Sequence, residues 1–63
     1  MDIGDKVYCK DGIDRFRVGN YHMVEEIYRN GICIIDGVEF RYDNDELEEF
    51  YPSFWDYFEI CEN

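Results

Sequence analysis

The sequence predicts a small, mainly β fold that forms a single domain over residues 1–63. Two tight-turn dipeptides, Asn30-Gly31 and Asp36-Gly37, separate three short apolar runs. Such dipeptides favour two-residue hairpin turns, because both central positions of the turn need positive φ. The runs themselves are rich in β-branched and aromatic residues, which are typical of strands. A chain of 63 residues buries only ~60% of its unfolded surface, and its one Trp, six Tyr and five Phe help to fill the core.

The two turns predict a three-stranded meander and its register. If Arg29 faces Ile32, then Tyr28 faces Cys33, and the second turn places Cys33 opposite Phe40. One face, expected to be the core, then carries Tyr28, Cys33, Ile35, Val38, Phe40 and Tyr42. The opposite face carries Ile27, Ile32, Ile34, Glu39 and Arg41. The adjacent Glu25 and Glu26 interrupt the alternation and indicate a β-bulge.

Further elements are predicted on both sides of the meander. Residues 3–10 read as a first strand, and a loop follows over residues 11–20. Asp43 is expected to cap a short helix over residues 44–50, with Glu46 as its capping-box partner, and Pro52 ends that helix. Residues 54–61 are predicted to form the last strand, with a single helical turn before it.

This order of elements is that of a small five-stranded SH3-like barrel with one short helical turn before the last strand. Gly4-Asp5-Lys6-Val7 resembles the first strand of such barrels, where a Gly-Asp turn leads into an inward-facing valine. The chain also resembles small acidic uncharacterised proteins encoded by bacteriophages, through residues 4–9 and through Tyr57-Phe58 near its end. The resemblance implies a viral origin and a host-cell cytoplasmic location, and it implies no catalytic residues.

Composition excludes several classes of protein. Cys9, Cys33 and Cys61 are odd in number and too widely spaced for a disulfide framework or a thiolate zinc site, so three reduced thiols, no metal and no cofactor are expected. No apolar run approaches the ~18 residues of a membrane span, which predicts a cytoplasmic protein. The net charge of −10 argues against direct nucleic-acid or membrane contact, since phosphates demand Lys and Arg.

No catalytic motif stands out in the sequence. The single histidine, His22, has no Ser or Cys partner in a known pattern and is expected to be a solvent-facing or edge-strand residue rather than a general base. The acids of residues 43–49 lack the glycine and ligand spacing of a calcium-binding loop. We therefore expect a protein that is not an enzyme.

The acidity is concentrated in one half of the chain. Residues 32–63 contain ten acids and one base, a net charge of −9, whereas residues 1–31 contain six acids and five bases, a net charge of −1. Repulsion among these like charges lowers the stability of the fold. The acids are also interleaved with aromatic residues, which are favoured at protein interfaces. Phe40, Phe54 and Phe58 are expected inside, with Tyr51 and Trp55 as an exposed pair. The predicted partner-binding residues are Glu39, Asp43, Asp45, Glu46, Glu48, Glu49, Tyr51, Trp55, Asp56 and Glu59.

Two functions fit this pattern. The first is a non-enzymatic acidic protein that binds and inhibits or redirects a host protein with a basic nucleic-acid-binding surface. It acts either through an acidic patch or by mimicking nucleic acid, whose phosphates are spaced ~3.4 Å along each strand. The alternative is a small structural or assembly module that homodimerises or docks on a larger complex. A solvated acidic face with no partner remains the simplest structural interpretation.

Overall fold

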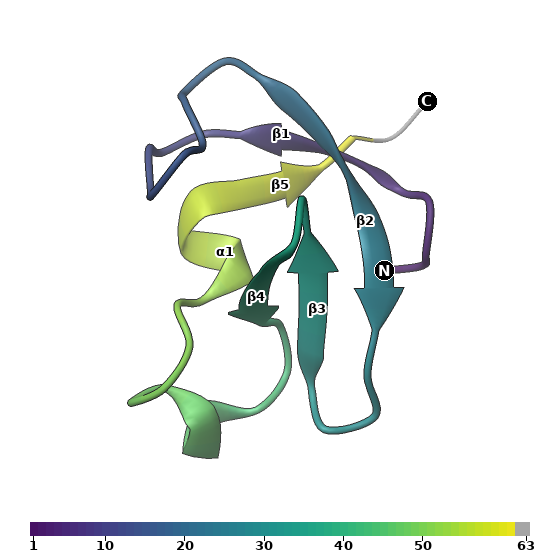
Figure 1. Ribbon diagram of the computed structural model, residues 1–63, viewed down its shortest axis with the longest axis vertical. Coiled ribbons are helices and arrows are strands. Elements are labelled where there is room, and N and C mark those ends of the chain that lie inside the picture. Colours follow the sequence, from purple (N-terminus) through teal and green to yellow (C-terminus); the bar gives the residue numbers. More distant parts are fainter. Residues whose placement is uncertain (62–63) are drawn as a thin grey trace.

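The computed structural model describes residues 1–61 and shows one antiparallel sheet that curls into a half-barrel (Figure 1). Its strands are β1 (Lys6–Cys9), β2 (Tyr21–Ile27), β3 (Ile32–Ile35), β4 (Val38–Arg41) and β5 (Phe58–Ile60). A 3₁₀ turn, η1 (Asp45–Leu47), and a short helix, α1 (Phe54–Tyr57), lie between β4 and β5. The strand order is β4-β3-β2-β1-β5. The predicted small SH3-like barrel, with a helical turn before its last strand, is confirmed.

The second hairpin has the predicted register. Ile35 pairs with Val38, and Cys33 pairs with Phe40. Asp36 and Gly37 adopt φ values of 50° and 79°, as a two-residue turn of the expected type requires.

The first hairpin differs from the prediction by one residue. Ile27, not Tyr28, pairs with Cys33, and the amide of Tyr28 donates to the carbonyl of Ile32 at 2.8 Å. The turn therefore contains three residues and ends at Gly31, whose φ is 91°. As a result Ile27 packs against the core, and Tyr28 is 49% exposed.

The predicted bulge is present and explains why the strand can change faces. The pairing of β2 with β3 shifts between Val24, which faces Ile35, and Glu26, which faces Ile34. The extra residue at this bulge lets Val24 before it and Ile27 after it both point inward.

The core is built around four phenylalanines. The ring centroid of Phe58 lies 5.2 Å from those of Phe16 and Phe40 and 5.5 Å from that of Phe54. The predicted burial of Phe40, Phe54 and Phe58 is confirmed, and Phe16, from the loop between β1 and β2, joins them. The full buried cluster is Val7, Cys9, Phe16, Val24, Cys33, Ile35, Phe40, Phe54 and Phe58.

The elements after β4 are shorter than predicted. The expected helix over residues 44–50 is reduced to η1, and its N-cap is Asn44 rather than Asp43. Asn44 Oδ1 accepts a hydrogen bond from the amide of Glu46 at 3.0 Å. A longer helix would place Glu48 and Glu49 at a helix C-terminus, where negative charge is unfavourable. The last strand covers only Phe58–Ile60, because Phe54–Tyr57 forms α1.

Candidate functional site: the acidic segment

Residues 43–50, here called the acidic segment, lie in a loop that leaves the sheet after β4 and returns to it. The amide of Arg41 donates to the carbonyl of Pro52 at 2.9 Å, and Arg41 forms a parallel bridge with Ser53. The amide of Tyr42 donates to the carbonyl of Gly31 at 2.7 Å. These bonds close the loop at its base, and η1 lies at the bottom of the view in Figure 1.

The loop also rests directly on the first hairpin turn. Asn44 Nδ2 donates to the carbonyl of Asn30 at 3.0 Å. A Cβ atom placed on Gly31 would lie 2.8 Å from Cβ of Asn44 and 3.1 Å from its backbone nitrogen. Gly31 is thus needed twice, for its positive φ and for this close approach.

The five carboxylates of the acidic segment all belong to exposed residues. They are those of Asp43, Asp45, Glu46, Glu48 and Glu49. Within residues 1–61 one ion pair involves them, between Arg41 Nη1 and Asp45 Oδ1 at 3.3 Å, and the Asp45 side chain is 97% exposed. Such an exposed pair contributes little, so the segment keeps nearly all of its negative charge. Glu62, one of the ten acids counted in residues 32–63, lies outside the described residues.

The aromatic part of the predicted site is only partly correct. Trp55 is 46% exposed as predicted, but its indole Nε1 donates to the carbonyl of Tyr42 at 2.8 Å, which fixes the ring beside the loop. Tyr51 is half-buried, so the predicted exposed pair is wrong for this residue. Phe50 takes its place at 72% exposure, the largest value among the big apolar side chains of the described residues. Its position directly after Glu48-Glu49 is a sequence signal that the prediction overlooked.

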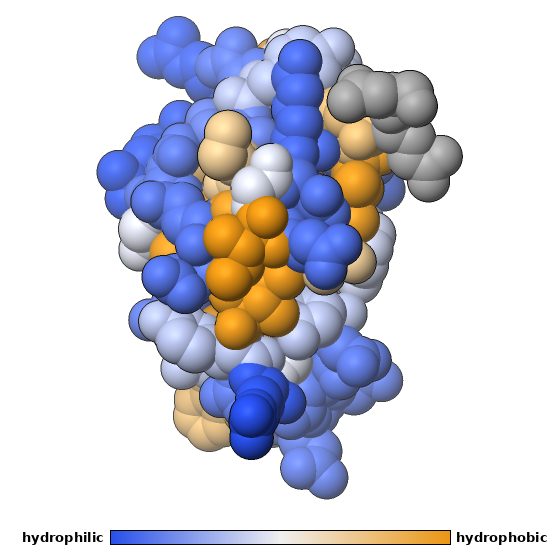
Figure 2. Space-filling view, turned by 90° about the vertical axis from the view of Figure 1, so that its right-hand side faces the viewer, coloured by the Kyte–Doolittle hydropathy of each residue, from blue (hydrophilic) through white to orange (hydrophobic). Residues whose placement is uncertain are grey.

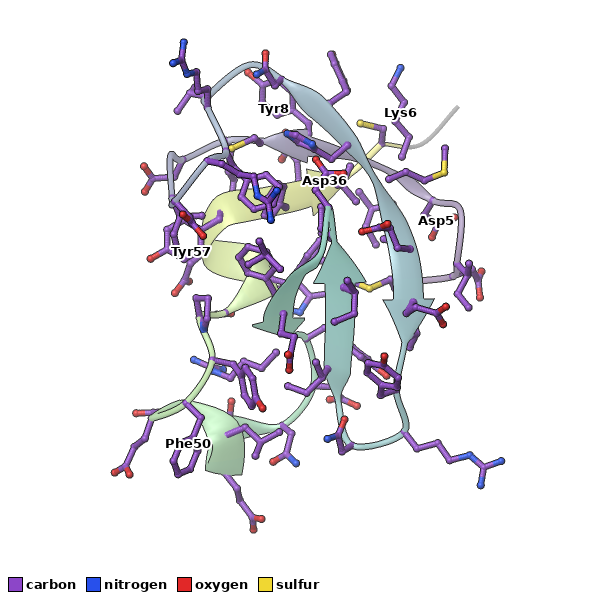
Figure 3. The ribbon with its side chains drawn as sticks, in the orientation of Figure 1. Asp5, Lys6, Tyr8, Asp36, Phe50 and Tyr57 are labelled. Carbon is purple, nitrogen blue, oxygen red and sulfur yellow. The ribbon has the colours of Figure 1, made fainter. Side chains whose placement is uncertain are left out.

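The remaining predicted residues are exposed but do not belong to the acidic segment. Glu39 lies on β4 opposite Ile34, Asp56 lies on α1, and Glu59 lies on β5 opposite Tyr8. In Figure 3 Phe50 marks the acidic segment at one end of the long axis, and Tyr8 lies at the other end. The predicted set is therefore split between surfaces that one small contact would not cover together.

His22 is not the solvent-facing or edge residue that the sequence suggested. It lies on β2, between β1 and β3, and pairs with Val7. Its Nδ1 lies 2.6 Å from Oδ2 of Asp36, and its ring meets Phe16 edge to face with 4.8 Å between centroids. Nε2 is buried and has no hydrogen-bond partner within the described residues. An Asp–His pair can serve a general base only when Nε2 reaches a substrate, and burial prevents this here.

The thiols differ in their surroundings. Cys9 and Cys33 are buried and Cys61 is half-buried, and all three are free. Burial raises the pKa of the Cys33 thiol to about 11. Burial also raises the pKa of Cys9, and its thiol donates to the carbonyl of Asp11 at 3.1 Å. Both buried thiols are therefore protonated and unreactive at neutral pH.

Within residues 1–61, no cluster of three or more His, Cys, Asp or Glu side chains could hold a metal ion. The same part of the chain contains no helix long and apolar enough to cross a bilayer.

One apolar surface lies outside the acidic segment. The side of the molecule along β2 shows an apolar patch framed by hydrophilic side chains (Figure 2). Met23 of β2 and Ile3, before β1, are 57% and 61% exposed. Scattered exposed apolar side chains are common on folded proteins, so this surface is not included in the candidate site.

Comparison with known proteins returned no match. No family model, no curated protein and no solved structure is significantly similar to this chain.

Proposed function

We propose that the chain is a non-enzymatic binding protein whose acidic segment docks onto a basic nucleic-acid-binding surface of another protein and blocks or redirects it. The observation that carries this proposal is a group of five carboxylates, all on exposed residues, next to the exposed ring of Phe50. Complementary charge steers association, and an aromatic anchor supplies affinity at the centre of a contact. In keeping with the resemblance to phage proteins, we propose a viral protein that acts in the host cytoplasm.

The geometry favours a compact acidic patch over an extended copy of nucleic acid. An α-helix over residues 44–50 would have set carboxylates in regular rows ~5–6 Å apart at Cβ. The segment instead contains a 3₁₀ turn of three residues, Asp45–Leu47, inside an irregular loop. A short patch of this kind matches a basic patch on a protein better than it matches a long phosphate array.

The test compares two variants with equal changes in charge. The first changes Glu46, Glu48 and Glu49 to Gln and leaves Asp45 in place, because Asp45 pairs with Arg41. The control changes three exposed acids elsewhere, Asp11, Asp14 and Glu26, to Asn, Asn and Gln.

The parent protein and the two variants are each immobilised and exposed to bacterial lysate. The affinity of a captured protein for each of the three is then measured by surface plasmon resonance at several salt concentrations. We expect the captured partner to be a nucleic-acid-binding protein. Added duplex DNA or RNA should compete with the immobilised protein and release this partner. The acidic-segment variant should bind it more weakly, with slower association and a shallower salt dependence, while the control binds normally. Changing Phe50 or Trp55 to Ala should also weaken binding.

Unchanged affinity in the acidic-segment variant would reject the proposal. A contact that also survives high salt would favour the alternative, an assembly module. Gel filtration of the protein alone would then show whether it forms homodimers.

A further inference from the structure

A second surface with binding potential lies at the opposite end of the molecule. A shallow pocket of about 340 Å³ opens on the outer face of the sheet where β1, β2 and β5 meet. Its walls are Tyr8, Tyr21, Glu59, Ile60 and Cys61. Tyr8 is the cross-strand partner of both Tyr21 and Glu59, so these three side chains share one face. The volume is near the lower end of the ~300–1,000 Å³ range of ligand sites, which suits a single side chain.

The aromatic wall of this pocket already attracts a cation. The rings of Tyr8 and Tyr21 are 5.4 Å apart between centroids and tilted by 57°. Lys6 Nζ lies 4.4 Å from the centroid of Tyr21, within the ~6 Å range of a cation–π contact. In Figure 3 Lys6 and Tyr8 lie near each other at the top of the molecule. Tyr21 is 57% exposed, so its ring is also accessible to other molecules.

The opposite wall adds a negative charge. Glu59 is exposed on β5, and the chain as a whole carries a charge of −10, which disfavours an anionic occupant. β5 is an edge strand of the sheet, so an extended segment of another protein can approach along it. Of the basic side chains, arginine suits the pocket best, because its planar guanidinium stacks on rings and pairs with carboxylates.

We propose that this pocket binds an arginine side chain of a partner protein, with the guanidinium between Tyr21 and Glu59. This site does not depend on the acidic segment, and either site can fail without the other.

The probe is the blocked tripeptide acetyl-Gly-Arg-Gly-amide, titrated into ¹⁵N-labelled protein and followed by amide chemical shifts. We expect saturable shifts at the pocket residues with a dissociation constant on the order of millimolar, since one exposed cation–π contact and one exposed ion pair are each weak. The citrulline peptide, which has nearly the same shape but no charge, should not bind.

Four variants test the roles of the walls. Tyr21→Ala and Glu59→Gln should each raise the dissociation constant about two- to five-fold. Glu48→Gln, the same charge change in the acidic segment, should leave it unchanged. Lys6→Gln should lower it, because the competing ammonium leaves the ring.

Three results would overturn the assignment. They are an absence of shifts up to about ten times the expected dissociation constant, shifts confined to residues 43–50, and equal affinity for the citrulline peptide.

Discussion

Replacing Gly31 by alanine tests how the acidic segment is held against the barrel. The glycine has a φ of 91°, and the new Cβ would lie 2.8 Å from Cβ of Asn44 and 3.1 Å from the Asn44 nitrogen. The left-handed conformation costs a residue with a Cβ about 1–2 kcal/mol. Overpacking against a neighbour that cannot move aside adds about 1–3 kcal/mol.

The sum, about 2–5 kcal/mol, is large for this chain. At about 0.05–0.15 kcal/mol per residue, a domain of 63 residues has a total stability of roughly 3–9 kcal/mol. We therefore expect Gly31→Ala to be marginally folded at room temperature. Valine at the same position should be worse, since a β-branched residue resists positive φ.

The chain supplies two matched controls. Gly19 has a φ of 95°, and a Cβ atom placed on it would meet nothing within 4 Å. Gly37 has a φ of 79°, and its Cβ would meet only the flexible Arg15 side chain at 3.7 Å. Both alanine variants should lose about 1–2 kcal/mol, the backbone cost alone. Urea unfolding followed by Trp55 fluorescence gives the three values, and equal losses in all three variants would refute the proposed contact between Gly31 and Asn44.

Other changes test other parts of the structure. Asp36→Asn keeps a residue that tolerates positive φ but removes the charge beside His22, and should lower the unfolding free energy by up to about 1 kcal/mol in urea denaturation; no change would mean that the pair contributes nothing. The pKa of Cys33 is raised from 9.0 to about 11, so the unfolded chain loses this proton first and the unfolding free energy should fall as pH rises from 9 to 11. Cys33→Ala should show a smaller fall over that range, and an identical slope would contradict this. Phe50→Ser should change thermal stability by less than about 0.5 kcal/mol, whereas Phe54→Ala, at a fully buried position, should cost about 3–5 kcal/mol.

The two hairpins show where the sequence was sufficient and where it was not. Asp36-Gly37 was predicted correctly because both residues adopt positive φ and the turn closes locally. Asn30 does not adopt positive φ, so Gly31 ends a three-residue turn. A glycine in the left-handed region is compatible with either loop length. In the three-residue turn Gly31 lies close to Asn44, which is far along the chain, and no local pattern indicates this approach.

The candidate site was predictable in its charge but not in its aromatics. Carboxylates stay in contact with water because burying an unpaired charge is costly, so composition alone placed the acids at the surface correctly. Phe50 and Tyr51 are adjacent and chemically alike, and only the path of the loop decides which is exposed. His22 likewise pairs with Asp36, fourteen residues away, and no local pattern indicates this contact.

The interactions that hold the acidic segment on the barrel make almost no use of its carboxylates. The hydrogen bonds that hold the loop use main-chain atoms of Arg41, Tyr42 and Pro52, and the amide side chain of Asn44. Among the carboxylates of the segment only that of Asp45 makes a side-chain contact within residues 1–61, and this contact is exposed. The carboxylates of Glu46, Glu48 and Glu49 make no hydrogen bond or ion pair that helps to close the loop within residues 1–61. No such bond therefore offsets the free-energy cost of their mutual repulsion. A binding role gives that repulsion a reason, since charges that a fold does not need are free to match the surface of a partner.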